Sequence, residues 1–133
     1  MTARRHGEVA LGPLELAVLD RLWAAGPAAV GGVHAAVGRE RGLSRNTVHS
    51  TLERLVRKGL VARRKLGRAY EYRARLSRQE WVTDVLGSLV EHVPGVDAPL
   101  LVSAFVDLAE RTDADTLAEL EALVRARRAG EKR

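Results

Sequence analysis

The segment that begins at Ser44 constrains the fold more than any other part of the chain. Ser44 is a favourable N-cap, and Gly59 ends a helical pattern. One helical face is aliphatic and consists of Val48, Leu52, Leu55 and Val56. The opposite face has nothing apolar to bury and consists of Arg45, Asn46, His49, Ser50, Glu53 and Arg54. The pattern predicts a helix with one buried side and one side that faces outward.

Shorter elements are predicted on both sides of this helix. Before it, the pattern indicates a helix over 13–25, a segment over 28–30 that is extended at most, and a second helix over 33–41. After it, residues 60–66 and 69–74 combine β-formers with arginines around a Gly-Arg turn, which predicts a basic hairpin. Only 4% of the residues are aromatic, which favours a mainly helical core of Leu, Val and Ala.

Three further helices are predicted in residues 77–133. A capping box opens the first of them at Ser77, Pro99 starts the second, and Asp113 or Thr112 caps the third. A segment of 57 residues is near the lower limit for an independent hydrophobic core. These three helices can therefore hardly bury all of their apolar faces against one another.

Charge is distributed unevenly along the chain. Residues 1–76 hold 15 Lys and Arg against 6 Asp and Glu, a net charge of +9, whereas residues 77–133 hold 7 against 11, a net charge of −4. A basic part joined to an acidic part predicts that a polyanion binds one end only. The alternative is a solvated surface that happens to be lopsided.

Three helices followed by a basic hairpin describe a winged helix-turn-helix, so we expect a DNA-binding domain in residues 1–76. The third helix fits the major groove, and its candidate DNA contacts are Ser44, Arg45, Asn46, Thr47, His49, Ser50 and Arg54. The hairpin cations suit phosphates or the minor groove and are Arg63, Arg64, Lys65 and Arg68. Each of these residues also has a structural alternative. His49 could be only a solvated helix residue, and Arg54 could pair with side chains of its own helix instead of DNA. Tyr70 and Tyr72 could cover the core of the wing instead of contacting DNA.

Residues 77–133 are expected to be a three-helix dimerisation region. Packing against a second copy across a two-fold axis would bury the apolar faces. Because a two-fold dimer binds two equivalent half-sites, we expect a pseudo-palindromic DNA target. The candidate dimerisation residues are Trp81, Val85, Leu89, Leu101, Phe105, Leu117, Leu120 and Val124. The alternative is that these helices fold back on the first helix of their own chain.

Several classes of protein are not expected. The four histidines lie in unrelated elements, and there is no phosphate-binding loop or catalytic triad pattern, so neither an enzyme nor a metal or cofactor site is predicted. The absence of cysteine removes disulfides and Cys-ligated zinc. No apolar run approaches the roughly 18 residues of a membrane span, and the start of the chain lacks a signal peptide, which predicts a cytoplasmic protein without membrane insertion.

Two segments carry a family resemblance, LELAVLDRLW and LSRNTVHSTLERLVRKGLVARRKLGRAYEYRA. They resemble the BlaI/MecI/CopY group of bacterial transcriptional repressors of the penicillinase repressor type. The sequence from Thr47-Val48 to Leu60 is the most specific part of this resemblance. The likeness covers nearly the whole chain, although beyond residue 81 it rests on the helix pattern.

The resemblance implies a homodimeric repressor on a palindromic double-stranded operator, which controls β-lactam-resistance or related genes. It also implies relief of repression through a membrane metallopeptidase sensor, or a protease that depends on it, with cleavage between Asn and Phe in the dimerisation region. Phe105 matches that place, and Ala104 stands where the group has Asn. Copper-responsive members carry a C-terminal cysteine motif that this chain lacks.

Two other functions remain open from the sequence. A ligand-responsive winged-helix regulator of the MarR-like type would bind a small molecule between its domains. A winged helix that serves only as a protein interaction module would need a less basic and more apolar surface over 45–58 than this chain has.

Overall fold

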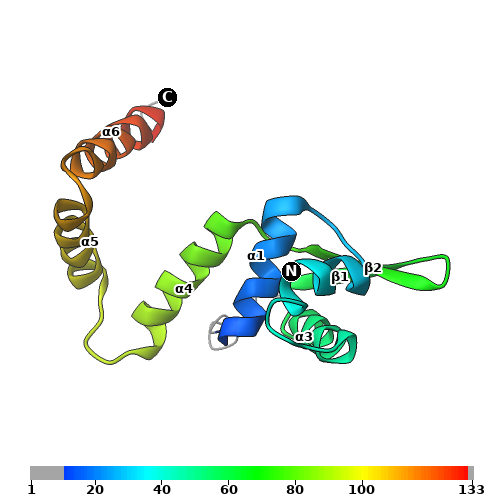
Figure 1. Ribbon diagram of the computed structural model, residues 1–133. Helices are drawn as coiled ribbons and strands as arrows, with labels where there is room; N and C mark the ends of the chain where they lie inside the picture. The colour runs from blue at the N-terminus through cyan, green and yellow to red at the C-terminus, as the bar shows by residue number, and fades with distance from the viewer. Residues whose placement is uncertain (1–10, 132–133) are drawn as a thin grey trace. The chain divides into compact units, whose positions relative to one another are not determined.

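A computed structural model describes residues 11–131, which form two compact units (Figure 1). The first unit extends to His92, and the second begins at Val93. The elements of the first unit are α1 (Pro13–Ala25), α2 (Val30–Val33), the π-helix η2 (His34–Gly38), α3 (Arg45–Arg57), β1 (Val61–Leu66), β2 (Ala69–Ala74) and α4 (Arg78–His92). Those of the second unit are α5 (Ala98–Thr112) and α6 (Ala114–Glu131). The predicted fold class, mainly helical with a small β-hairpin, is confirmed.

The core of the first unit lies between α1, α3 and the base of the hairpin. Its buried side chains are aliphatic except for one tyrosine, and they are Val18, Leu19, Leu22, Val33, Val37, Val48, Leu52, Leu55, Leu60, Val61, Tyr72 and Leu76. The aliphatic face predicted for α3 is therefore the face that packs into the core. This packing leaves the polar face of α3 toward solvent.

The hairpin is a regular antiparallel pair. The register runs from Val61 opposite Ala74 to Leu66 opposite Ala69, and Gly67 supplies the positive φ of 63° that the tight turn requires. Ala28 adds one bridge on the far side of β2, where its N–H and C=O exchange hydrogen bonds of 2.9 and 2.8 Å with Tyr72. This bridge fixes the wing against the body of the first unit.

The second helix starts earlier than the sequence predicts. It begins at Val30 and contains both glycines that were expected to precede it, so the expectation of an extended Val30 is wrong. Ala28 is extended because it pairs with Tyr72, and Ala29 is the extended N-cap. The helix begins where this pairing to the hairpin ends.

The π-helix η2 continues this helix, and its last residue, Gly38, lies very close to α3. Gly38 is buried, and a Cβ atom added to it would lie 2.5 Å from His34 Cδ2 and 3.0 Å from Val48 Cγ2. The His34 ring is itself fixed, because its Nε2 lies 2.7 Å from the carbonyl oxygen of Leu43. Glycine at position 38 therefore allows η2 to pack directly on α3.

The starts of the last three helices follow from local hydrogen bonds. At Ser77 the predicted capping box is present, with both reciprocal hydrogen bonds to Glu80 at 3.0 Å. Asp113 caps α6 by accepting the N–H of residue 116 at 2.8 Å. Helix α5 begins one residue before Pro99, because Asp97 accepts the N–H of residue 100 at 2.9 Å and so supplies a cap that the sequence analysis missed.

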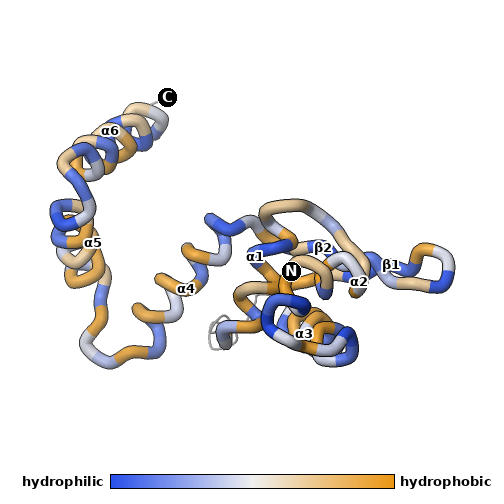
Figure 2. Tube along the Cα trace, viewed as in Figure 1, coloured by the Kyte–Doolittle hydropathy of each residue, from blue (hydrophilic) through white to orange (hydrophobic). Residues whose placement is uncertain are grey.

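The last three helices leave much of their apolar surface exposed. Along α4, α5 and α6, apolar and polar residues alternate (Figure 2). Large apolar side chains are exposed on these helices at Val82, Leu89, Val90, Leu100, Val102, Phe105, Leu108, Leu117, Leu123 and Val124. No helix among residues 11–131 has both the length and the apolar character to span a membrane.

Candidate nucleic-acid interface

The outward face of α3 presents side chains that are free to bind a partner. Ser44 accepts the N–H of Thr47 at 3.1 Å, and their hydroxyls lie 3.0 Å apart, so these two residues are used to start the helix. Five further predicted contacts are exposed and form no hydrogen bond or ion pair within the described chain, namely Arg45, Asn46, His49, Ser50 and Arg54. Their donors and acceptors face solvent along the length of one helix face.

Arg45 lies against the beginning of α2. A Cβ atom added to Gly31 would lie 3.1 Å from Nη2 of Arg45. The glycine therefore gives the guanidinium room to lie close to the backbone of α2, beside the N-terminal turn of α3. In this position the Arg45 charge is at the end of α3 that enters the groove in winged helix-turn-helix proteins.

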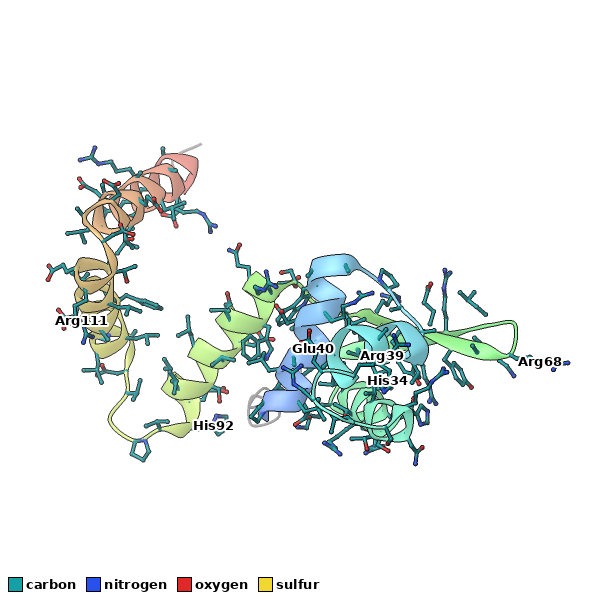
Figure 3. All side chains as sticks on the ribbon, in the orientation of Figure 1. His34, Arg39, Glu40, Arg68, His92 and Arg111 are labelled. Carbon is teal, nitrogen blue, oxygen red and sulfur yellow. The ribbon has the colours of Figure 1, made fainter. Side chains whose placement is uncertain are left out.

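The hairpin cations differ in how free they are. Lys65 and Arg68 are exposed and have no ion-pair partner among residues 11–131, and Arg68 projects from the turn of the wing (Figure 3). Nε of Arg64 donates to Oε1 of Glu71 at 3.1 Å. Arg63 is the most restrained of the four, because it pairs with a glutamate of α3 and its Cζ lies 4.7 Å from the centre of the Tyr70 ring.

The partner of Arg63 is Glu53, which the sequence places on the outward polar face of the helix. That expectation is wrong, because Glu53 is half-buried between α3 and the hairpin. Its Oε1 pairs with Nη1 of Arg63, and its Oε2 accepts the hydroxyl of Tyr72 at 2.7 Å. The two tyrosines also separate, since Tyr72 is in the core and Tyr70 is exposed.

The ionisation of this cluster follows from its contacts. Burial alone would raise the pKa of Glu53, but the hydrogen bonds from Tyr72 and Arg63 outweigh it and hold the pKa of this carboxyl below its usual value. Burial, together with the hydrogen bond to Glu53, raises the pKa of Tyr72 to about 12. Glu53 is therefore charged and Tyr72 neutral at neutral pH.

A second ion pair joins the C-terminal end of α3 to α1. Nζ of Lys58 lies 2.7 Å from Oε2 of Glu15, a buried residue in the first turn of α1. Burial would raise the pKa of Glu15, but Lys58, the backbone N–H of Gly12 and the charge of Arg54 together lower it. The sequence contained a signal for a paired, buried Glu15, because this residue has helical spacing to the apolar Val18, Leu19 and Leu22.

The start of α4 is joined to α1 within the first unit. Nε1 of Trp23 donates to the carbonyl oxygen of Leu76 at 2.9 Å, and the rings of Trp23 and Trp81 are 5.8 Å apart. Arg78 lies over the Trp23 ring at 5.4 Å and pairs with Asp20 at 2.5 Å. Part of the Trp81 surface assigned to dimerisation thus packs inside its own chain.

The other predicted dimerisation residues lie on α4, α5 and α6. Val85, Leu101 and Leu120 are partly buried, and Leu89, Phe105, Leu117 and Val124 are exposed. Between α5 and α6 there is a cavity of about 180 Å³ lined by Phe105, Leu108, Ala109, Thr112, Thr116 and Leu120. No group of three or more acidic or histidine side chains that could hold a metal occurs within the described ranges.

The helical core, the outward polar face of α3 and the basic wing together define a winged-helix DNA-binding protein. Residues 11–126 match the family model of the penicillinase repressor. The chain is 36% identical over 120 residues to the transcriptional regulator BlaI of two Mycobacterium tuberculosis strains, CDC 1551 / Oshkosh and ATCC 25618 / H37Rv, with 84% of this chain and 86% of the relative covered. The chain belongs to the penicillinase repressor family.

A solved structure shares the fold of the first unit. The solution structure of the DNA-binding domain of the repressor BlaI aligns with a TM-score of 0.50 and 21% identity, covering 60% of this chain and 93% of that domain. The family resemblance seen in the sequence is confirmed, and the chain is a transcriptional repressor with a winged-helix DNA-binding domain. Because its relatives are transcriptional regulators, the expectation that it is not an enzyme is also confirmed.

Proposed function

We propose that the chain represses transcription as a homodimer bound to a palindromic operator in the cytoplasm. The observation that carries this proposal is the face of α3, where five exposed polar side chains have no hydrogen-bond or ion-pair partner among the described residues. Such a face binds a groove that offers its own donors and acceptors, as the major groove of DNA does. The penicillinase repressor family supports the same function.

Base contacts and phosphate contacts divide between α3 and the wing in this proposal. Arg45 and Asn46 suit bidentate contacts to guanine and adenine, respectively, and His49 and Ser50 extend the reading surface by one turn. The remaining contacts position the protein on the backbone, with Lys65 and Arg68 as the freest cations of the wing. The proposed contacts are Ser44, Arg45, Asn46, Thr47, His49, Ser50, Arg54, Arg64, Lys65 and Arg68. Arg63, which the sequence also predicts as a contact, is paired with Glu53 in the unbound protein.

A mobility-shift titration tests the DNA-binding part. The protein is expected to bind the DNA that flanks its own gene more tightly than random DNA at physiological salt. Arg45→Ala and Asn46→Ala should change the base preference, whereas Arg68→Ala should weaken binding to all sequences and reduce the salt slope by about 0.9. Equal binding of promoter and random DNA would refute specific repression, and a reversed pattern of the variants would refute the assigned roles.

The homodimer is proposed from the apolar surface of the last three helices. The exposed side chains on α4, α5 and α6 include Leu89, Phe105, Leu117 and Val124, which a second copy would bury. The proposed boundary of this dimerisation region is residue 77, with residues 1–76 as the DNA-binding domain. Sedimentation should give a dimer at micromolar concentration, and Leu117→Asp should shift it toward the monomer. A wild-type monomer would contradict the proposal.

We further propose that the regulated genes confer β-lactam resistance or a related response, with relief through a membrane metallopeptidase sensor or its dependent protease. The bond between Ala104 and Phe105 lies within α5, and both residues are exposed. A protease would need this helix to open before it could cleave there. Mass spectrometry of the protein from induced cells should show fragments that end at Ala104, and an intact chain under full induction would refute cleavage at this bond.

A further inference from the structure

Outside the hydrophobic core, one face of the wing contacts α3 through the side chain of Glu53. The register sets Arg63 opposite Tyr72 and Lys65 opposite Tyr70, so these four side chains share a face. Tyr72 is in the core, whereas Tyr70 and Lys65 are exposed. Beyond Tyr72, the hairpin therefore has no apolar anchor on α3.

Glu53 supplies that attachment with both of its carboxylate oxygens. One oxygen pairs with Arg63 of β1, and the other accepts the hydroxyl of Tyr72 of β2 at 2.7 Å. A single side chain of the helix that faces the major groove therefore contacts both strands of the wing. These two contacts hold the wing against α3, in addition to the Ala28 bridge and the core packing of Tyr72.

The same ion pair changes the charge that the wing presents. The Arg63 side chain is 38% exposed and pairs with Glu53, whereas the Arg64 side chain is 67% exposed and pairs with Glu71 of its own hairpin. Arg63 is also packed against the ring of Tyr70. The Arg63 charge is already compensated by Glu53, so a phosphate contact through Arg63 competes with this pair, which is not so for Lys65 or Arg68.

We propose that Glu53 is a positioning residue that determines specificity, because it holds the wing at a set angle to α3 and withholds the Arg63 charge from DNA phosphates. This inference rests on the proposed DNA-binding function. Phosphate contacts raise affinity for every sequence alike, so a cation held in an internal pair lowers binding to random DNA. A wing that is already oriented also loses less conformational freedom when it binds the operator.

The test compares two duplexes of equal length, one selected by the wild-type protein from a randomised pool and one of random sequence. Fluorescence anisotropy gives the affinity of each between about 50 and 200 mM salt. The variants are Glu53→Gln, Arg63→Gln and the double variant. Glu71→Gln is the matched control, because it removes the same charge from the pair on the other face of the wing.

For random DNA, Glu53→Gln should increase the magnitude of the salt slope by about 0.9. Between about 50 and 200 mM salt, the affinity of this variant should therefore fall by about 3.5-fold more than that of the wild type. The ratio of selected to random affinity should fall. Arg63→Gln should leave the wild-type slope unchanged and should cancel the increase in the Glu53→Gln background. In the Glu71→Gln background, Arg63→Gln should again have no effect, because positions 63 and 71 are not coupled.

Two results would overturn the inference. The first is a loss of about 0.9 in slope for Arg63→Gln alone, since Arg63 would then already bind a phosphate. The second is a Glu53→Gln variant with unchanged slope and specificity ratio. If Glu53→Gln does not fold, Arg63→Gln decides the question, because it retains the bond between Glu53 and Tyr72. If no sequence is enriched from the pool, the proposed function itself fails.

Discussion

Removing the hydroxyl of Tyr72 should destabilise the protein and change how its stability depends on alkaline pH. Tyr72→Phe keeps the buried ring but deletes the 2.7 Å hydrogen bond to Glu53. A hydrogen bond to a charged group contributes about 1.5–3 kcal/mol, and water can partly replace it at a half-buried carboxylate, so we expect a loss of about 1–2 kcal/mol at pH 7. The ring contacts of the core remain, which separates this effect from cavity formation.

The sign of the pH dependence follows from the raised pKa of Tyr72. Its value is 10.0 without interactions and about 12 in the folded protein. The stabilisation is fully present below pH 10 and is lost as the pH rises toward 12, because the hydroxyl ionises first in the unfolded chain. At pH 11 the loss is about 1.4 kcal/mol, so the wild type and Tyr72→Phe should become nearly equal in stability.

Urea unfolding followed by circular dichroism measures this difference at a fixed protein concentration from pH 7 to about pH 11.5. Both proteins have the same other titratable groups, so the contributions of those groups cancel in the comparison. An advantage of the wild type that stays constant to pH 11.5 would refute the reasoning, since Tyr72 would then ionise equally in the folded and unfolded states.

Three further substitutions give expected changes in the free energy of unfolding. Glu15→Gln should cost about 1–2 kcal/mol at pH 7, and the difference from the wild type should shrink as the pH falls below 4.5, because the pair with Lys58 holds the pKa of Glu15 below that value. Gly38→Ala should lower the stability by about 1–3 kcal/mol through the clash with His34, seen as a lower thermal midpoint. Ser44→Ala should cost about 1 kcal/mol in the same measurement, because it removes the cap of α3.

Most elements of the fold could be predicted because their signals are local. The apolar spacing of α3, the capping box at Ser77, the cap at Asp113 and the turn at Gly67 are all confirmed. Each of them depends on residues within about one helical turn of one another. The start of α2 at Val30 could not be predicted in this way, because it depends on a strand pairing with residues more than 40 positions away.

The candidate site was predictable in its residue types but not in its pairings. The exposed set on α3 follows from helical periodicity alone, and Arg45 and Asn46 are exposed as expected. The role of Glu53 depends on where Tyr72 places its hydroxyl, which requires the hairpin register and the packing of the wing on α3. Spacing along one helix contains no information about such a contact.

The wing is a two-stranded sheet, and the outer edge of β1 has no neighbouring strand in the described part of the chain. An unpaired edge with free N–H and C=O groups is a template for pairing with another molecule, and a row of cations is one way in which proteins prevent this. Arg63, Arg64 and Lys65 occupy that edge in succession. Neutralising all three would therefore have a cost beyond weaker DNA binding, because it would leave an open strand that could join the wings of separate molecules into insoluble aggregates.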